Sequence, residues 1–172
     1  TPPPADPWGG LRRVGAAPGA PVPHPADDAD HLRGGGGPPL APSGWLGRLR
    51  TRQPGVGAVP VDTVLGDGDV LPVAGGLRVV HTPGHTPEHV SLLHQSSGTL
   101  ITGDAIWNMN ARRTWPVMAF SRDGALTPKT AHRLGDLEYS TAAVMHGPEI
   151  RRTVREAIRD ILRRPRGFRM FL

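Results

Sequence analysis

Four of the eight histidines lie in one stretch, residues 77–107, and the residues around them could hold a divalent metal. His85 follows a Thr-Pro-Gly turn signal after one predicted strand, and Asp104 follows Gly103 at the end of another. An imidazole and a carboxylate at two strand ends can converge on one point at the edge of a sheet. Because these groups are ligands for zinc and similar metals, the stretch predicts metal-dependent chemistry.

Short runs of branched residues, separated by turn signals, predict the sheet that would position these side chains. Two of the strands flank the loop that carries His85, and a late one would deliver His146. Strands are predicted over residues 60–65, 70–73, 77–82, 89–93, 99–102 and 140–145.

Two helices are predicted to accompany the sheet. Thr127 as N-cap and Pro128 at the first helical position predict one that runs to about residue 134 or 137. Apolar residues at helical spacing predict another that starts around Glu149 and ends at the next proline. We expect this last helix to pack on the sheet, with its N-terminus pointing at the metal edge.

The motifs HTPGHTPEH and LITGDA closely resemble those of the metallo-β-lactamase-fold hydrolases, and within them the glyoxalase II-like group. The resemblance implies that His85 and Asp104 are metal ligands, with the aspartate bridging two metals, and that His89 supports the site. The family's last ligand is a His-Gly pair after a late strand, which His146 and Gly147 match. The implied fold is α/β, the αββα metallo-β-lactamase sandwich.

The family's first ligand motif is T-H-x-H-x-D-H-x-G-G. The segment TPPPADPWGG matches it only at the positions that are not histidine. We interpret this segment as the motif with every histidine replaced by proline, and a chance match of a proline-rich linker is the alternative. On this interpretation Asp6 is a retained ligand that would also orient the attacking hydroxide. The framework positions in register are Thr1, Asp6, Gly9 and Gly10, and the prolines at histidine positions are Pro2, Pro4 and Pro7.

These replacements should weaken metal binding, because proline offers a metal no lone pair. By the resemblance, the first metal site keeps only His85 and should be lost, since zinc sites need three or four protein ligands. The second site keeps Asp6, Asp104 and His146. We therefore expect reduced or absent zinc, compared with up to two ions in intact relatives.

The remaining histidines are interpreted structurally. His81 on a strand is read as a packed histidine, and His94 as a surface one. The crowded segment HPADDADHLR is read as the acidic start of a solvated helix. Ligation by His24 or His31 in place of the missing histidines is the alternative.

Composition indicates one partial domain whose first third is loosely ordered. Glycine and proline make up 43 of 172 residues and concentrate before residue 76. The family's strands before the first ligand motif are absent, so we expect a sandwich incomplete at its N-terminus. The predicted organisation is a Gly/Pro-rich segment over 1–58, the sheet and helices over 59–164, and a tail over 165–172.

For intact relatives the resemblance implies metal-assisted hydrolysis of a thioester, lactone or similar ester-type bond in a small molecule. Here we expect impairment and leave open whether the chain is an enzyme. A non-catalytic scaffold that binds a partner or ligand is the alternative. Nucleic-acid binding is a weaker one: residues 149–172 carry the whole net charge of +5, but an arginine-rich solvated helix face explains this. With no cysteine and no membrane-spanning apolar run, we expect a cytoplasmic protein.

Overall fold

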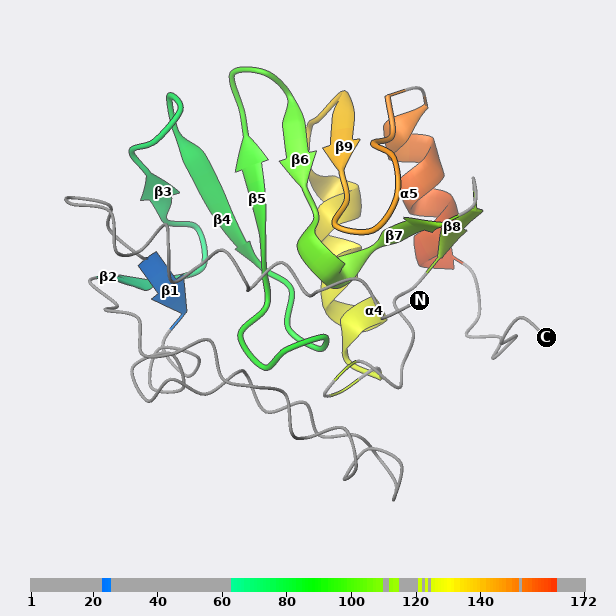
Figure 1. The fold of residues 1–172 in the computed structure, drawn as a ribbon, viewed down its shortest axis with the longest axis horizontal. Helices are drawn as coiled ribbons and strands as arrows, with labels where there is room; N and C mark the ends of the chain where they lie inside the picture. Colours follow the sequence, from blue (N-terminus) through cyan, green and yellow to red (C-terminus); the bar gives the residue numbers. More distant parts are fainter. Residues whose placement is uncertain are drawn as a thin grey trace, which may run out of the picture.

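Figure 1 shows the fold in a computed structural model, which describes residues 23–25, 63–109, 112–114, 121, 123, 125–151 and 153–163. Among these residues, α-helices are α4 (Thr127–Ala131) and α5 (Val154–Arg163), and 3-10 helices span Gly103–Ala105 and His132–Asp136. The strands are β1 (Pro23–Pro25), β2 (Thr63–Leu65), β3 (Val70–Leu71), β4 (Leu77–His81), β5 (Val90–His94), β6 (Thr99–Ile101), β7 (Trp107–Met109), β8 (Arg112–Thr114) and β9 (Thr141–Ala143).

The central sheet has five strands in the order β3-β4-β5-β6-β9. The first three pairings are antiparallel, and β9 then joins β6 in parallel. Strands β4, β6 and β9 therefore run in the same direction. Their carboxyl ends lie on one edge of the sheet, where the segments carrying His85, Asp104 and His146 emerge. Two small sheets flank it, a parallel β1-β2 pair and an antiparallel β7-β8 pair.

The core lies between one face of this sheet and the helices. Alternate residues of a strand face opposite sides, so Val80, Leu93, Leu100 and Ala142 share one face and are buried there. Helix α5 covers them with apolar residues at helical spacing. Its buried residues are Val154, Ala157, Ile158, Ile161 and Leu162.

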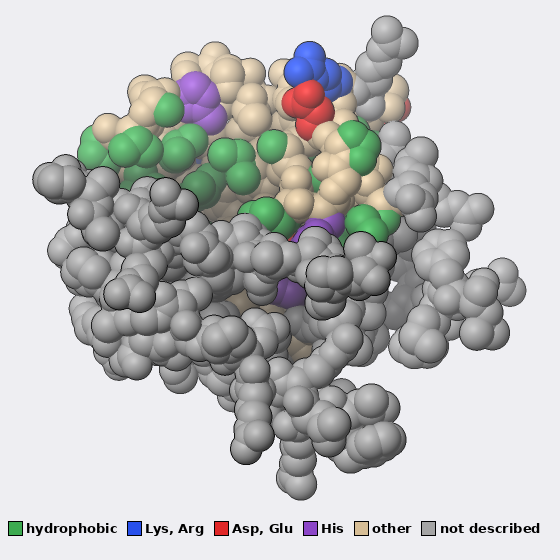
Figure 2. Space-filling view, in the orientation of Figure 1, with side chains coloured by type: hydrophobic (Ala, Val, Ile, Leu, Met, Phe, Trp, Pro, Cys, Tyr) green, Lys and Arg blue, Asp and Glu red, His purple; other side chains and the backbone are tan. Residues whose placement is uncertain are grey.

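The opposite face of the sheet is less enclosed, and Figure 2 shows hydrophobic side chains gathered on the side turned toward the viewer. Ile101 is 36% exposed, whereas its neighbour Leu100 is fully buried on the helix side. The other large exposed hydrophobic residues among those described are Val64, Val70, Val73, Met109 and Met145.

Most predicted elements are confirmed. The strands over 77–82, 89–93 and 99–102 appear as β4, β5 and β6, each within one residue of its predicted limits. The predicted helix from Thr127 appears as α4 continued by the 3-10 helix to Asp136. The predicted α/β class is also confirmed. The segment predicted to hold the first ligand motif and the tail over 165–172 lie outside the described residues.

The prediction for the last helix is wrong at its start. Residue Ile150 forms an antiparallel bridge to Ala142, with hydrogen bonds of 2.9 and 2.8 Å between their backbones. This extended backbone holds the chain against β9, so that α5 begins only at Val154, after Thr153 at φ 49°. The helix then begins beside Tyr139 and Ser140, which precede β9. Its N-terminus therefore lies away from the edge where His146 emerges.

In the part of the chain that the structure describes, no helix has both the length and the apolar character needed to cross a membrane.

Replacing Ile158 by alanine should destabilise the domain strongly. The side chain is fully buried between α5 and the sheet, so its loss removes apolar contacts and leaves a cavity. We expect the free energy of unfolding in urea to fall by about 2–5 kcal/mol. Arg163→Ala, at the exposed end of the same helix, is the control and should change it by less than about 0.5 kcal/mol. Equal effects of the two substitutions would contradict this placement of the core.

Candidate functional site

The side chains of His85, Asp104 and His146 meet at the sheet edge. The Nε2 atom of His85 lies 3.5 Å from Oδ2 of Asp104, and Nε2 of His146 lies 3.2 Å from Oδ1. Each imidazole thus faces a different oxygen of one carboxylate. The side chains are 15%, 18% and 36% exposed for His85, Asp104 and His146, so the cluster is sheltered but open to solvent.

Backbone pairing beyond the ends of β6 and β9 brings two of these residues together. The Thr102 amide donates to the Ala143 carbonyl at 2.9 Å, and the Met145 amide donates to the Gly103 carbonyl at 3.4 Å. These bonds continue the parallel ladder past the named strands. The residues that follow, Asp104 and His146, are therefore held side by side.

Strand β7 holds the His146 loop from the other side. The Asn108 amide donates to the His146 carbonyl at 2.9 Å, and the Asn108 side chain donates to the Pro148 carbonyl at 2.7 Å. Gly147 lies between these two bonds at φ 105°. A Cβ there would collide with the Asn108 carbonyl oxygen, so only glycine allows the loop to approach this strand.

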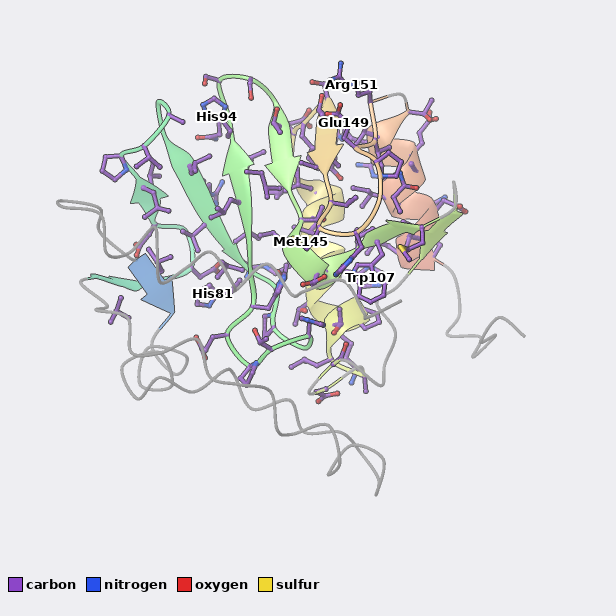
Figure 3. All side chains as sticks on the ribbon, viewed as in Figure 1. His81, His94, Trp107, Met145, Glu149 and Arg151 are labelled. Atoms are coloured by element: carbon purple, nitrogen blue, oxygen red, sulfur yellow. The ribbon has the colours of Figure 1, made fainter. Side chains whose placement is uncertain are left out.

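Trp107 fixes the carboxylate of Asp104. Its indole N–H donates to Oδ1 at 2.7 Å, the same oxygen that faces His146. Its ring also packs against the imidazole of His146, with centroids 4.5 Å apart. Figure 3 labels Trp107 on β7 and Met145 on the loop after β9. One buried side chain therefore orients two members of the cluster.

A sequence profile of the Metallo-beta-lactamase superfamily matches residues 6–165. The chain belongs to this superfamily. Among solved structures it is similar to TTHA1429 from Thermus thermophilus, a metallo-beta-lactamase family protein, at 28% identity and a TM-score of 0.51, covering 70% of this chain and 40% of that one.

Two further solved structures show the same fold at lower identity. The BLEG-1 B3 metallo-beta-lactamase matches at 22% identity and a TM-score of 0.66, covering 88% of this chain and 68% of that one. TTHA1623, solved in a di-iron-bound form, matches at 18% identity and a TM-score of 0.58, covering 90% of this chain and 69% of that one. The chain therefore spans between 40% and 69% of the length of these three proteins.

His89 contacts the backbone of Asp104, beneath the cluster. Its Nε2 atom accepts a hydrogen bond of 2.9 Å from the Asp104 amide. A Cβ on Gly103 would lie 2.6 Å from the same nitrogen, and Gly103 has φ 54°. Glycine at this position thus lets the turn before Asp104 sit directly on the His89 ring.

A chain of buried hydroxyl groups continues from the other ring nitrogen of His89. Its Nδ1 lies 2.8 Å from the Thr82 hydroxyl, which lies 3.0 Å from the Ser91 hydroxyl, which donates to the Thr102 carbonyl at 3.0 Å. A hydroxyl has one proton, so Ser91 must accept from Thr82, and Thr82 must accept from Nδ1. His89 is therefore the neutral tautomer with its proton on Nδ1.

The surroundings of His89 keep it neutral. Burial, followed by the nearby charge of His85, lowers the pKa of His89 to about 4, and the partly opposing charge of Asp104 does not offset this. A proton on Nε2 would also point at the N–H of Asp104, and two donors cannot form a hydrogen bond with each other. The network is thus compatible with one protonation state only.

The structure brings together His85, Asp104 and His146, with His89 beneath them, as the motifs predicted. Asp6 and the three prolines lie outside the described residues. His24 lies in β1, and His31 also lies outside the described part of the chain. Within the described residues, no three His, Cys, Asp or Glu side chains form a group that could hold one metal ion.

Two other histidines do not join the site. His94 is a surface residue, as predicted, with Nδ1 2.7 Å from the Ser97 hydroxyl and Nε2 2.6 Å from the Ala74 carbonyl oxygen. His81 is half-buried on β4, and its Nε2 has no hydrogen-bond partner among the described residues.

Sequence reasoning missed the roles of Trp107, Asn108, Thr82 and Ser91. The sequence indicates for Trp107 only that it covers the sheet edge. Thr82 belongs to the turn signal before His85, and nothing in that motif indicates its contact with His89, seven residues later. The alternation of β4 and β5 gives the one available signal, because it places Thr82 and Ser91 on the same face of neighbouring strands.

The neutral state of His89 predicts how stability depends on pH. The folded pKa of about 4 lies below the ordinary value of 6.5, so between these pH values only the unfolded chain takes up the proton. The contribution is complete above pH 6.5 and is lost as pH falls toward 4, by about 3 kcal/mol in all. Urea unfolding across this range measures it.

His89→Gln is the matched control, because its amide can replace both hydrogen bonds but does not titrate. The variant should lose less stability than the parent chain between pH 6.5 and 4. An identical pH dependence would exclude His89 as its source.

Proposed function

We propose that the chain is a metal-dependent hydrolase domain of the glyoxalase II-like type, acting on a thioester, lactone or similar ester-type bond of a small molecule. The observation that carries the proposal is the position of Asp104, whose two oxygens each face a different imidazole. The substrate class rests on the resemblance of the TPGH and TGD motifs.

The donor atoms fit a divalent metal such as zinc. Two ligands bound to one tetrahedral zinc at about 2.0–2.2 Å lie about 3.3 Å apart. The His85–Asp104 and His146–Asp104 separations of 3.5 and 3.2 Å lie on either side of that value. One metal would take His85 and Oδ2, and another would take His146 and Oδ1, with Asp6 as a further ligand to the second.

When bound, the metal supplies Lewis-acid polarisation of the scissile carbonyl and makes water a nucleophile at neutral pH. The chain's own residues set the geometry. Asp104 holds a negative charge between two imidazoles, Trp107 fixes one of its oxygens, and His89 fixes its backbone. In this proposal Asp6 orients the attacking water.

The prolines at the three histidine positions support an impaired centre. They leave the His85 side with one nitrogen and one oxygen donor, and the His146 side with one more carboxylate at most. They also favour the second candidate, a non-catalytic scaffold that retains the fold and binds a partner or ligand. Metal content and hydrolysis, measured on the same sample, distinguish the two.

The first test removes the shared carboxylate. Asp104→Asn keeps the shape of the side chain but removes the charge that both imidazoles face, so zinc and iron content measured by mass spectrometry should fall to background. Thioester and lactone hydrolysis should fall to the rate without protein. Asp136→Asn, an exposed aspartate away from the cluster, is the control and should change neither quantity. A parent chain with no metal and no hydrolysis would favour the scaffold instead.

The second test restores the lost ligands. The combined changes Pro2→His, Pro4→His and Pro7→His should raise zinc content from at most about one to about two ions per chain, because each site would then have at least three protein ligands. Hydrolysis should rise with metal content. Pro3→His adds a histidine out of register with the motif and is the control. No gain over Pro3→His would show that the proposed register is wrong.

A further inference from the structure

The loop that carries His85 lies directly against helix α4. The loop joins β4 to β5, and a hydrogen bond of 2.8 Å from the Thr82 amide to the His89 carbonyl closes its base. At its tip Gly84 has φ 137°, and a Cβ there would collide with the backbone nitrogen and the hydroxyl of Thr127. Glycine thus lets the tip of the loop pack on the first residue of the helix.

Both backbone carbonyls that precede His85 accept hydrogen bonds from α4 and the turn before it. The Thr130 hydroxyl donates to the Pro83 carbonyl at 2.6 Å, and the Asp123 amide donates to the Gly84 carbonyl at 2.8 Å. Two carbonyls of the preceding helical turn also lie 3.2 and 3.4 Å from the Thr130 hydroxyl. A hydroxyl has one proton, so the much shorter contact with Pro83 is its principal hydrogen bond.

The turn before α4 is itself closed by Asp123. Its Oδ1 atom accepts hydrogen bonds of 2.9 Å from the amides of Ala125 and Leu126, and its carbonyl accepts one of 3.0 Å from the Leu126 amide. The amide that holds Gly84 therefore belongs to a turn with a fixed direction relative to the helix.

The same part of the chain also contacts the His85 side chain. Nδ1 of His85 lies 3.4 Å from the hydroxyl of Ser121, which is buried, and Nε2 lies 3.5 Å from Oδ2 of Asp104. Metal-binding histidines are commonly oriented by a hydrogen bond at their other ring nitrogen. Helix α4 also contacts the 3-10 helix Gly103–Ala105, so it borders both partners of the His85–Asp104 contact.

We propose that Thr130 is a positioning residue of the candidate metal centre, which acts on His85 through the Pro83 carbonyl. Its hydrogen bond keeps the tip of the loop on α4, so that the His85 ring lies between Ser121 and Asp104 with Nε2 directed at the carboxylate. The role of His85 as a metal ligand rests on the proposed function, whereas the attachment of its loop does not. His146 is held separately by β7 and should not depend on Thr130.

The first test follows the His85 ring by NMR in the metal-free full chain. Thr130→Val removes the hydroxyl and keeps the branched shape, and Thr130→Ser keeps the hydroxyl and is the matched control. Cross-relaxation between the His85 ring and the Ser121 side chain should be present in the parent chain and in Thr130→Ser, and lost in Thr130→Val. The contact between the rings of His146 and Trp107 should persist in all three chains.

A His85–Ser121 contact that survives in Thr130→Val, or that is lost equally in Thr130→Ser, would overturn the proposal. Loss of the His146–Trp107 contact in Thr130→Val would also overturn it, because Thr130 would then support the fold in general.

Hydrogen exchange measures the same attachment on the backbone. In Thr130→Val the Asp123 amide, which bonds to the Gly84 carbonyl, should exchange about tenfold faster than in the parent chain, because the loop opens from α4 more easily. The Asn108 amide, which bonds to the His146 carbonyl, should exchange at the parent rate. Thr130→Ser should match the parent chain at both amides. Unchanged exchange at Asp123, or an equal rise at Asn108, would overturn the proposal.

Failure of this inference differs from failure of the proposed function, because both measurements use the metal-free chain. A parent chain that takes up no metal and hydrolyses no ester would count against the hydrolase. An unmoved His85 ring in Thr130→Val would count against Thr130 alone.

Discussion

The candidate site depends on the position of one carboxylate between two imidazoles. Asp104 lies where the carboxyl ends of three strands of the same direction meet, and each of its oxygens faces a different histidine. Asp104 therefore connects the two histidines of the cluster. Interactions that hold Asp104 in place therefore matter as much as the two histidines.

Those interactions come from groups that are not among the predicted metal ligands. Trp107 holds one oxygen of Asp104, and His89 accepts from its backbone amide. The hydroxyls of Thr82 and Ser91 then fix the tautomer of His89. They also connect His89 by hydrogen bonds to the Thr102 carbonyl, next to Gly103. Buried polar groups are costly when any one of them is unpaired, and here each donor of the network has its acceptor. The network thus gives the turn before Asp104 a single arrangement.

The sequence predicted the central strands and the cluster because both have local signals. Turn residues delimit β4, β5 and β6, and the three ligand motifs fall just after strand ends. It did not predict the start of α5, because the Ile150–Ala142 bridge depends on a pairing that no local pattern shows. Trp107 was missed for a related reason: its role depends on the direction of an indole N–H, which the residue type does not determine.

The His85 side and the His146 side of Asp104 differ in the number of metal ligands that the proposed register leaves on each. His85 is the more sheltered imidazole, with Nδ1 3.4 Å from the Ser121 hydroxyl, but under the proposed register its two companion ligands have become proline. His146 is more exposed and packs against Trp107, and on its side the register retains one further carboxylate, Asp6. Because a stable zinc site needs at least three protein ligands, under that register only the His146 side approaches this number. If the centre binds a single ion, it should therefore lie between His146 and Oδ1, with the indole of Trp107 directly beside it.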